Sequence, residues 1–139
     1  MSDDLQRFVL AQDEAGTYPR AVRELQAGRK QSHWMWFVFP QIAGLGRSPM
    51  AQQYAIADLA EAQSYLRHPV LGARLRECAS LLSLTTSSTA EEIFGAVDAQ
   101  KLWSSMTLFA RADPQERAFR DVLDGYFDGK EDDGTTSRL

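Results

Sequence analysis

The sequence predicts an all-α protein, a compact single-domain bundle of six to eight helices with short connections. Apolar residues recur at spacings of three and four through most of the chain, as a buried helical face requires. No alternating run is convincing as a strand, and only residues 37–39 are ambiguous. A length of 139 residues fits one domain. We therefore expect a single helical domain over residues 1–139, with residues 129–139 as a flexible tail because they are rich in Gly, Asp, Thr and Ser.

Helix signals come early in the chain and repeat. The apolar stretch of residues 31–39 is stopped by Pro40, and a loop follows. Ser48 before Pro49 is typical of an N-cap followed by the first helical residue. Earlier in the chain, two apolar faces are formed by Leu5, Phe8 and Val9, and by Tyr18, Val22 and Leu25. Gly28 ends the second of these helical patterns.

The second half of the chain has stronger start signals. Asp58 with Glu61 and Thr89 with Glu92 each have the spacing of a capping box. Asp98 begins a long pattern, and a cap, a proline and a box together place the start of the last long helix at Asp113. The helix after His68-Pro69 has a buried face of Val70, Leu71, Leu75, Cys78, Leu81 and Leu82.

Composition excludes several classes of protein and site. Cys78 is the only cysteine, so no intramolecular disulfide can form, and the chain lacks a signal-peptide pattern or a membrane-length apolar run. We expect a cytoplasmic protein. A net charge of −4 argues against nucleic acid as a partner. His33 and His68 are too isolated for a zinc site, and the sequence predicts neither a metal nor a cofactor.

The first candidate segment for chemistry is the aromatic stretch after Lys30. His33, Trp34 and Trp36 lie within a few residues of one another. On a helix, Lys30, His33 and Trp34 would share one face, with Trp36 pointing elsewhere. One reading is a buried aromatic core with a hydrogen-bonded histidine; the other is a pocket in which an indole stacks on a planar ligand.

The second candidate segment is the glycine loop of residues 44–48. Glycines at 44 and 46 permit a backbone nest of N–H groups, and Arg47 and Ser48 precede a helix, so the loop could cradle a phosphate or carboxylate. An ordinary turn is the alternative. The loop is neither a P-loop nor a dinucleotide-binding fingerprint, since it lacks the required ending and no strand precedes it.

The third candidate segment is a polar helical face. Asp98, Lys101, Ser104 and Ser105 recur at spacings of three and four, opposite the apolar Leu102, Met106 and Phe109. Serines are poor residues for a helix interior, so a pocket wall would explain them. A solvated face with a local Asp98–Lys101 pair is the alternative.

Together these segments resemble one known family. His33-Trp-Met-Trp-Phe-Val-Phe-Pro-Gln41, Gly44-Leu-Gly46, Leu71-Gly-Ala-Arg-Leu75, Phe94-Gly-x-x-Asp98 and Lys101-Leu-x-Ser-Ser-Met-Thr-Leu-Phe109 are similar to the bacterial domain-of-unknown-function family eighteen-ten, whose members genome labels often call "calpastatin". The resemblance covers the chain from Leu5 to about Thr135. It implies an all-helical fold and no established reaction. The positions that it carries over are His33, Trp34, Trp36, Pro40, Gln41, Gly44, Gly46, Asp98, Lys101, Ser104, Ser105 and Thr107.

Two functions fit these observations. The first is binding or hydrolysis of a nucleotide-like anionic ligand; a loose similarity in size and helical class to NADAR-type domains suggests an ADP-ribose derivative. The second is a non-enzymatic interaction domain, for which a homodimer is one form. For the first, the predicted catalytic residues are His33, Asp98 and Lys101. The predicted ligand-binding residues are Trp34, Trp36, Gln41, Gly44, Gly46, Arg47, Ser48, Ser104, Ser105 and Thr107.

Overall fold

The structure is a computed structural model, and it describes residues 5–85 and 87–139. Residues 1–4 and 86 of the predicted domain lie outside the described residues. Across the described ranges the chain is helical, with one isolated bridge between Ile42 and Ile56 and no strand. The elements are α1 (Gln6–Asp13), the 3-10 turn η2 (Glu14–Gly16), α2 (Thr17–Gln26), α3 (Met35–Val38), α4 (Pro49–Gln53), α5 (Leu59–Arg67), α6 (Leu71–Ser83), α7 (Ala90–Phe94), α8 (Ala96–Ala112), α9 (Arg117–Phe127) and α10 (Asp133–Thr136).

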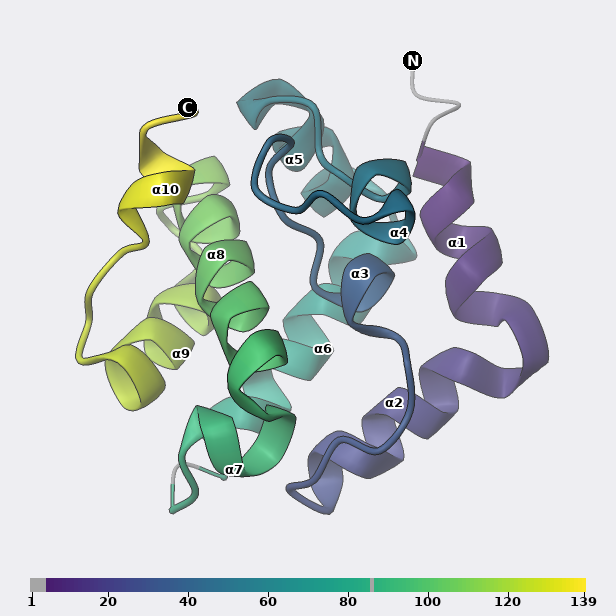
Figure 1. Cartoon of the computed structure of the whole chain (residues 1–139), viewed down its shortest axis with the longest axis vertical. Coiled ribbons are helices and arrows are strands. Elements are labelled where there is room, and N and C mark those ends of the chain that lie inside the picture. Colours follow the sequence, from purple (N-terminus) through teal and green to yellow (C-terminus); the bar gives the residue numbers. More distant parts are fainter. Residues whose placement is uncertain (1–4, 86) are drawn as a thin grey trace.

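The prediction of an all-α bundle is confirmed. Within the described residues, α1, α2, α5, α6, α8 and α9 have eight residues or more, and the other α-helices are of four or five. Helix α8 is the longest, and α5, α7, α9 and α10 pack against it, while α6 packs against α2, α5 and α9 (Figure 1). No helix in the described part of the chain is long and apolar enough to cross a membrane.

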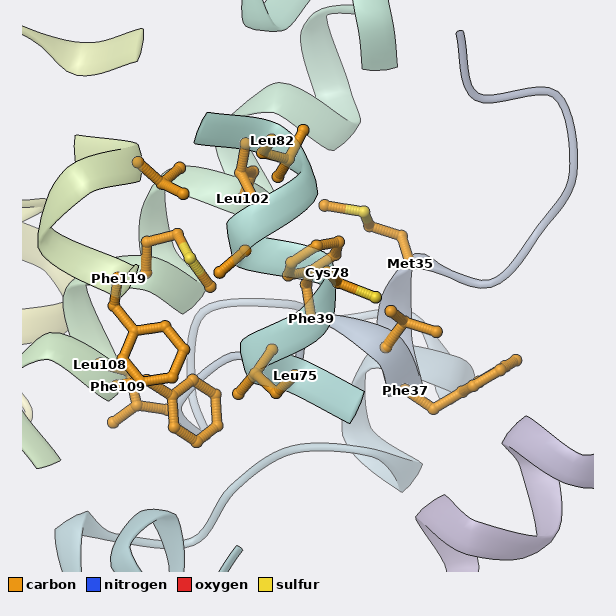
Figure 2. Close-up of a cluster of buried hydrophobic side chains, with 14 of the residues drawn as sticks. Met35, Phe37, Phe39, Leu75, Cys78, Leu82, Leu102, Leu108, Phe109 and Phe119 are labelled. Atoms are coloured by element: carbon orange, nitrogen blue, oxygen red, sulfur yellow. The ribbon is translucent and has the colours of Figure 1, made fainter. Parts of the chain in front are cut away.

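The core lies between α6, α8 and the aromatic segment before Pro40. Leu75, Cys78 and Leu82 of α6 are fully or almost fully buried, and Figure 2 shows them in one cluster with Phe39 and Phe109. The thiol of Cys78 is buried in this apolar setting, and burial raises its pKa to about 12. Cys78 is therefore a core residue with little thiolate at neutral pH.

The helix starts predicted at Ser48, Asp58 and Thr89 are confirmed, and the start predicted at Asp113 lies three residues later. Ser48, Asp58 and Thr89 each cap a helix through the side chain, and Thr89 with Glu92 forms a complete capping box. The last long helix does not start at Asp113. Residues 113–116 form a turn instead, and the side chain of Glu116 caps α9.

The aromatic segment is helical only from Met35 to Val38, so Lys30, His33 and Trp34 do not share a helical face. The path of residues 31–34 is set by Glu24 of α2, a residue only 9% exposed. Its carboxylate accepts hydrogen bonds from the backbone N–H of Gln31 at 2.8 Å and of Ser32 at 3.0 Å, and from the Trp34 indole N–H at 2.9 Å. The Ser32 hydroxyl donates a further one. One carboxylate thus fixes the chain after α2 as it turns back toward the core.

These hydrogen bonds change the acidity of Glu24. Burial alone raises the pKa of its carboxyl, but the donors from Ser32, Gln31 and Trp34 outweigh burial and lower the pKa to about 2. Donors that bind the charged form of a group favour that form. The carboxylate therefore stabilises the fold wherever it stays ionised.

Residues of the predicted tail, 129–139, make hydrogen bonds with α8. Asp132 is 7% exposed, and its carboxylate accepts hydrogen bonds from Ser104 Oγ at 2.6 Å and Thr135 Oγ1 at 2.8 Å. Its backbone N–H donates to Thr107 Oγ1. Next to Asp132, the Glu131 carboxylate accepts hydrogen bonds from Arg111 and Arg120. The bonds from Arg111 lower the pKa of Glu131 most, burial opposes them, and the bond from Arg120 lowers it further, to about 2. The tail therefore packs on α8 and ends in a short helix of its own.

We predict that Asp132→Ala lowers the free energy of unfolding by about 2 kcal/mol, because it leaves a buried hydroxyl on α8 without its charged partner. The melting temperature should fall by about 5–10 °C. The exposed Asp133→Ala variant is the matched control and should melt near the wild type. Equal melting temperatures for all three proteins would show that the tail does not contribute to stability.

A second prediction concerns the stability of the protein at acidic pH. The pKa of Glu24 is about 2 in the folded chain against an ordinary value of 4.5, so its contribution is complete above pH 4.5 and is lost as the pH falls toward 2. A shift of this size corresponds to about 3 kcal/mol. Chemical denaturation of wild type and Glu24→Gln should therefore show a stability gap of this order at pH 7 that narrows toward pH 2.

The exposed Glu14→Gln variant is the control for this comparison and should follow the wild type throughout. A gap between wild type and Glu24→Gln that stays constant from pH 7 to pH 2 would contradict the assigned role of the carboxylate.

Candidate functional site

Two lysines and one aspartate meet where the segment before α3 contacts the start of α8. Lys30 Nζ lies 2.8 Å from Asp98 Oδ2, and Lys101 Nζ lies 3.5 Å from Asp98 Oδ1. We call Lys30, Asp98 and Lys101 the lysine–aspartate cluster. With two ammonium groups and one carboxylate it has a formal charge of +1 in a chain whose net charge is −4. The cluster can therefore attract an anion even though the protein as a whole is acidic.

Each lysine of the cluster also lies over an indole ring. Lys30 Nζ is 5.1 Å from the ring centroid of Trp34, and Lys101 Nζ is 5.0 Å from that of Trp36. Ammonium groups at this range are attracted to the negative face of the ring. Trp36 is half-buried, unlike the fully buried Trp34.

The two lysines differ in how fully they are engaged. Lys30 also donates to the carbonyl oxygen of Ser32 at 2.6 Å, and its side chain is 8% exposed. Among the described residues, Lys101 has only the longer ion pair with Asp98 besides its contact with the Trp36 ring, and its side chain is 18% exposed. Lys101 is therefore the cation with donors left for an external ligand, and Lys30 holds Asp98 in place.

Trp34 takes the core role that the sequence left open. Its side chain is fully buried, and the indole N–H is bonded to Glu24. Its ring also packs near Phe39 and Phe94. A ring with no exposed surface cannot stack on a ligand in this structure, so the predicted ligand-binding role does not fit Trp34.

The predicted catalytic residues are only partly brought together. Asp98 and Lys101 are neighbours, as expected. His33 is exposed, one residue before Trp34, and its approach to a ligand bound at Lys101 stays a prediction. Ser105 lies one turn after Lys101 on α8, but it is fully buried and its hydroxyl has no hydrogen-bond partner among the described residues.

The glycine loop has packing reasons for its residues. Gly44 has a φ of +99°, and a Cβ there would lie 2.8 Å from the Arg138 guanidinium. A Cβ on Gly46 would lie 2.4 Å from Cβ of Ala51 in α4. Arg47 is exposed, with its carbonyl oxygen bonded to Gln52. Together these contacts favour the ordinary turn over the anion cradle.

Four other predicted ligand-binding residues have structural partners. The hydroxyl of Ser48 caps α4 by accepting from the Ala51 N–H. Ser104 and Thr107 hold Asp132 of the tail. Gln41 is half-buried, and its carbonyl oxygen accepts from the Ile56 N–H at the isolated bridge. These side chains and backbone groups build the fold around the cluster.

Lys30 is the residue of the cluster that the predicted site omits. Its sequence signal was its place two residues after the helix-ending Gly28 and four before Trp34. Nothing in that spacing indicates the partner Asp98, which is 68 positions away along the chain. Among the described residues no group of three His, Cys, Asp or Glu side chains could hold a metal ion.

Comparisons with known proteins agree with the family resemblance. The family model described as "Protein of unknown function (DUF1810)" matches residues 2–139. The crystal structure of the conserved hypothetical protein Rv1873 from Mycobacterium tuberculosis is similar at 53% sequence identity and a TM-score of 0.94, covering 98% of this chain and 96% of that chain. A comparison with curated proteins found no match. The chain therefore belongs to the DUF1810 family, a family of proteins of unknown function.

Proposed function

We propose that this protein binds a small, nucleotide-like anionic ligand at Lys101 and Trp36. One observation carries the proposal: the Lys101 ammonium lies 5.0 Å from the centroid of a half-buried indole ring, with one ion pair of 3.5 Å as its other contact. A phosphate of the ligand would pair with Lys101. Its planar ring would lie against the open part of Trp36.

Binding fits the geometry better than hydrolysis. Both carboxylate oxygens of Asp98 face ammonium groups, so this side chain is placed to position the two lysines. We assign Asp98 this positioning role. For hydrolysis of an ADP-ribose derivative, the candidate general base is exposed His33, which is close to Trp36 in the sequence.

The alternative of an interaction domain depends on where the aromatic segment points. A flat apolar patch made by this segment would support it. Trp34, Phe37 and Phe39 are instead buried, and only Trp36 is half-exposed. The aromatic segment therefore builds core around the lysine–aspartate cluster, which favours ligand binding over a protein interface at this place.

The test is to measure the binding of AMP, ADP and ADP-ribose by calorimetry and by thermal shift. Adenosine and inorganic phosphate separate the contribution of the ring from that of the charge. We expect the three nucleotides to bind more tightly than either fragment. Lys101→Met should weaken their binding about tenfold or more, because one charge-assisted contact contributes about 1.5–3 kcal/mol. Trp36→Leu should weaken the ring-bearing ligands and leave phosphate unchanged.

Lys130→Met is the matched control, since it removes an exposed lysine that takes no part in the ion pairs of the cluster. It should bind like the wild type. The proposal is wrong if none of the three nucleotides binds, or if Lys101→Met keeps the wild-type affinity while remaining folded.

A further inference from the structure

A second cationic surface lies along α2 and the segment that follows it. A hollow of about 550 Å³ is lined by Arg20, Arg23 and Arg29, together with Glu24, Ala27, Gln31 and Ser32. We call it the arginine groove. Its volume falls in the range of small-ligand sites, roughly 300–1,000 Å³. It does not include Lys101 or Trp36, so it is separate from the site proposed above.

Local structure brings the three arginines together. Arg20 and Arg23 are three positions apart on α2, and Ala27 follows them along the helix. Gly28, with a φ of +73°, then reverses the chain, and the N–H of Arg29 bonds back to the carbonyl oxygen of Glu24. Arg29 therefore returns beside α2 and lines the same hollow as Arg20 and Arg23.

The one carboxylate in the groove does not neutralise these arginines. Glu24 accepts its four hydrogen bonds from Gln31, Ser32 and Trp34. Arg20 donates to the carbonyl oxygen of Ala15 at 3.0 Å, which orients its side chain. Within residues 5–85 and 87–139 no ion pair involves an arginine of the groove.

Five arginines elsewhere in the protein form ion pairs, whereas Arg47, Arg67 and Arg138, like those of the groove, form none among the described residues. Ion pairs with a carboxylate are formed by Arg74, Arg76, Arg111, Arg117 and Arg120. An acidic chain that leaves three arginines of one hollow without a carboxylate partner has a local excess of positive charge there. Guanidinium groups bind phosphate and carboxylate oxygens through paired N–H donors.

We infer that the arginine groove binds a small anion with at least two phosphate or carboxylate groups. One group would pair with Arg20 and Arg23 of α2, and another with Arg29 across the groove. The ligand needs no aromatic ring, since the groove offers no aromatic side chain among its lining residues. This distinguishes it from the nucleotide-like ligand proposed for Lys101 and Trp36.

The inference is tested by isothermal calorimetry at low ionic strength with tripolyphosphate and with citrate. We expect saturable binding of at least one of these anions, weakened as salt is added. The double variant Arg23→Gln with Arg29→Gln should lose at least tenfold in affinity. Both side chains are exposed, so the variant should keep the wild-type melting temperature. A preference for tripolyphosphate assigns the groove to phosphates, and a preference for citrate assigns it to carboxylates.

Two control variants keep the test specific. Arg117→Gln removes an exposed arginine elsewhere on the surface, and Lys101→Met removes the cation of the other proposed site. Neither should change the affinity for tripolyphosphate or citrate. The inference is overturned if neither anion binds, if Arg117→Gln weakens binding as much as the double variant, or if Lys101→Met abolishes it.

Discussion

The hydrogen bonds to the Glu24 carboxylate are the constraint on which the arrangement of both candidate surfaces depends. A buried carboxylate is costly unless donors surround it, and here two backbone N–H groups, a hydroxyl and an indole N–H do so. The donors come from residues 31–34, which form no regular element before α3. This carboxylate therefore fixes the path of that segment relative to α2.

Fixing this segment places chemically different side chains on its two sides. Lys30 enters the core side, where it pairs with Asp98 of α8 while its backbone N–H bonds to the carbonyl oxygen of Ile93. Arg29 and Gln31 line the groove on the opposite side. Lys101 and Trp36 then complete the first surface from α8 and α3. The Glu24 carboxylate thus fixes a segment that contributes residues to both cationic surfaces of this acidic protein.

The fold was predictable because its signals are local. Helical periodicity and the caps at Ser48, Asp58 and Thr89 depend on residues within one turn of each other. The candidate site was less predictable from the sequence, because only the tertiary fold brings Lys30 to Asp98. Composition suggested a flexible tail, because the sequence alone indicates a solvent-exposed Asp132. Its contacts with Ser104 and Thr107 are visible only in the tertiary structure. The arginine groove had no sequence signal, because its three arginines lie on two segments joined by a turn.

The most direct measurement is an NMR titration of the Glu24 side-chain carboxyl carbon in the folded protein, with near-ultraviolet circular dichroism as the check on folding at each pH. If the carboxylate is hydrogen-bonded as described, its signal stays that of the ionised form down to about pH 3, with a midpoint near 2. The Trp34 indole N–H should keep its hydrogen-bonded shift over the same range. A midpoint at the ordinary glutamate value of about 4.3 in a still-folded protein would contradict the account.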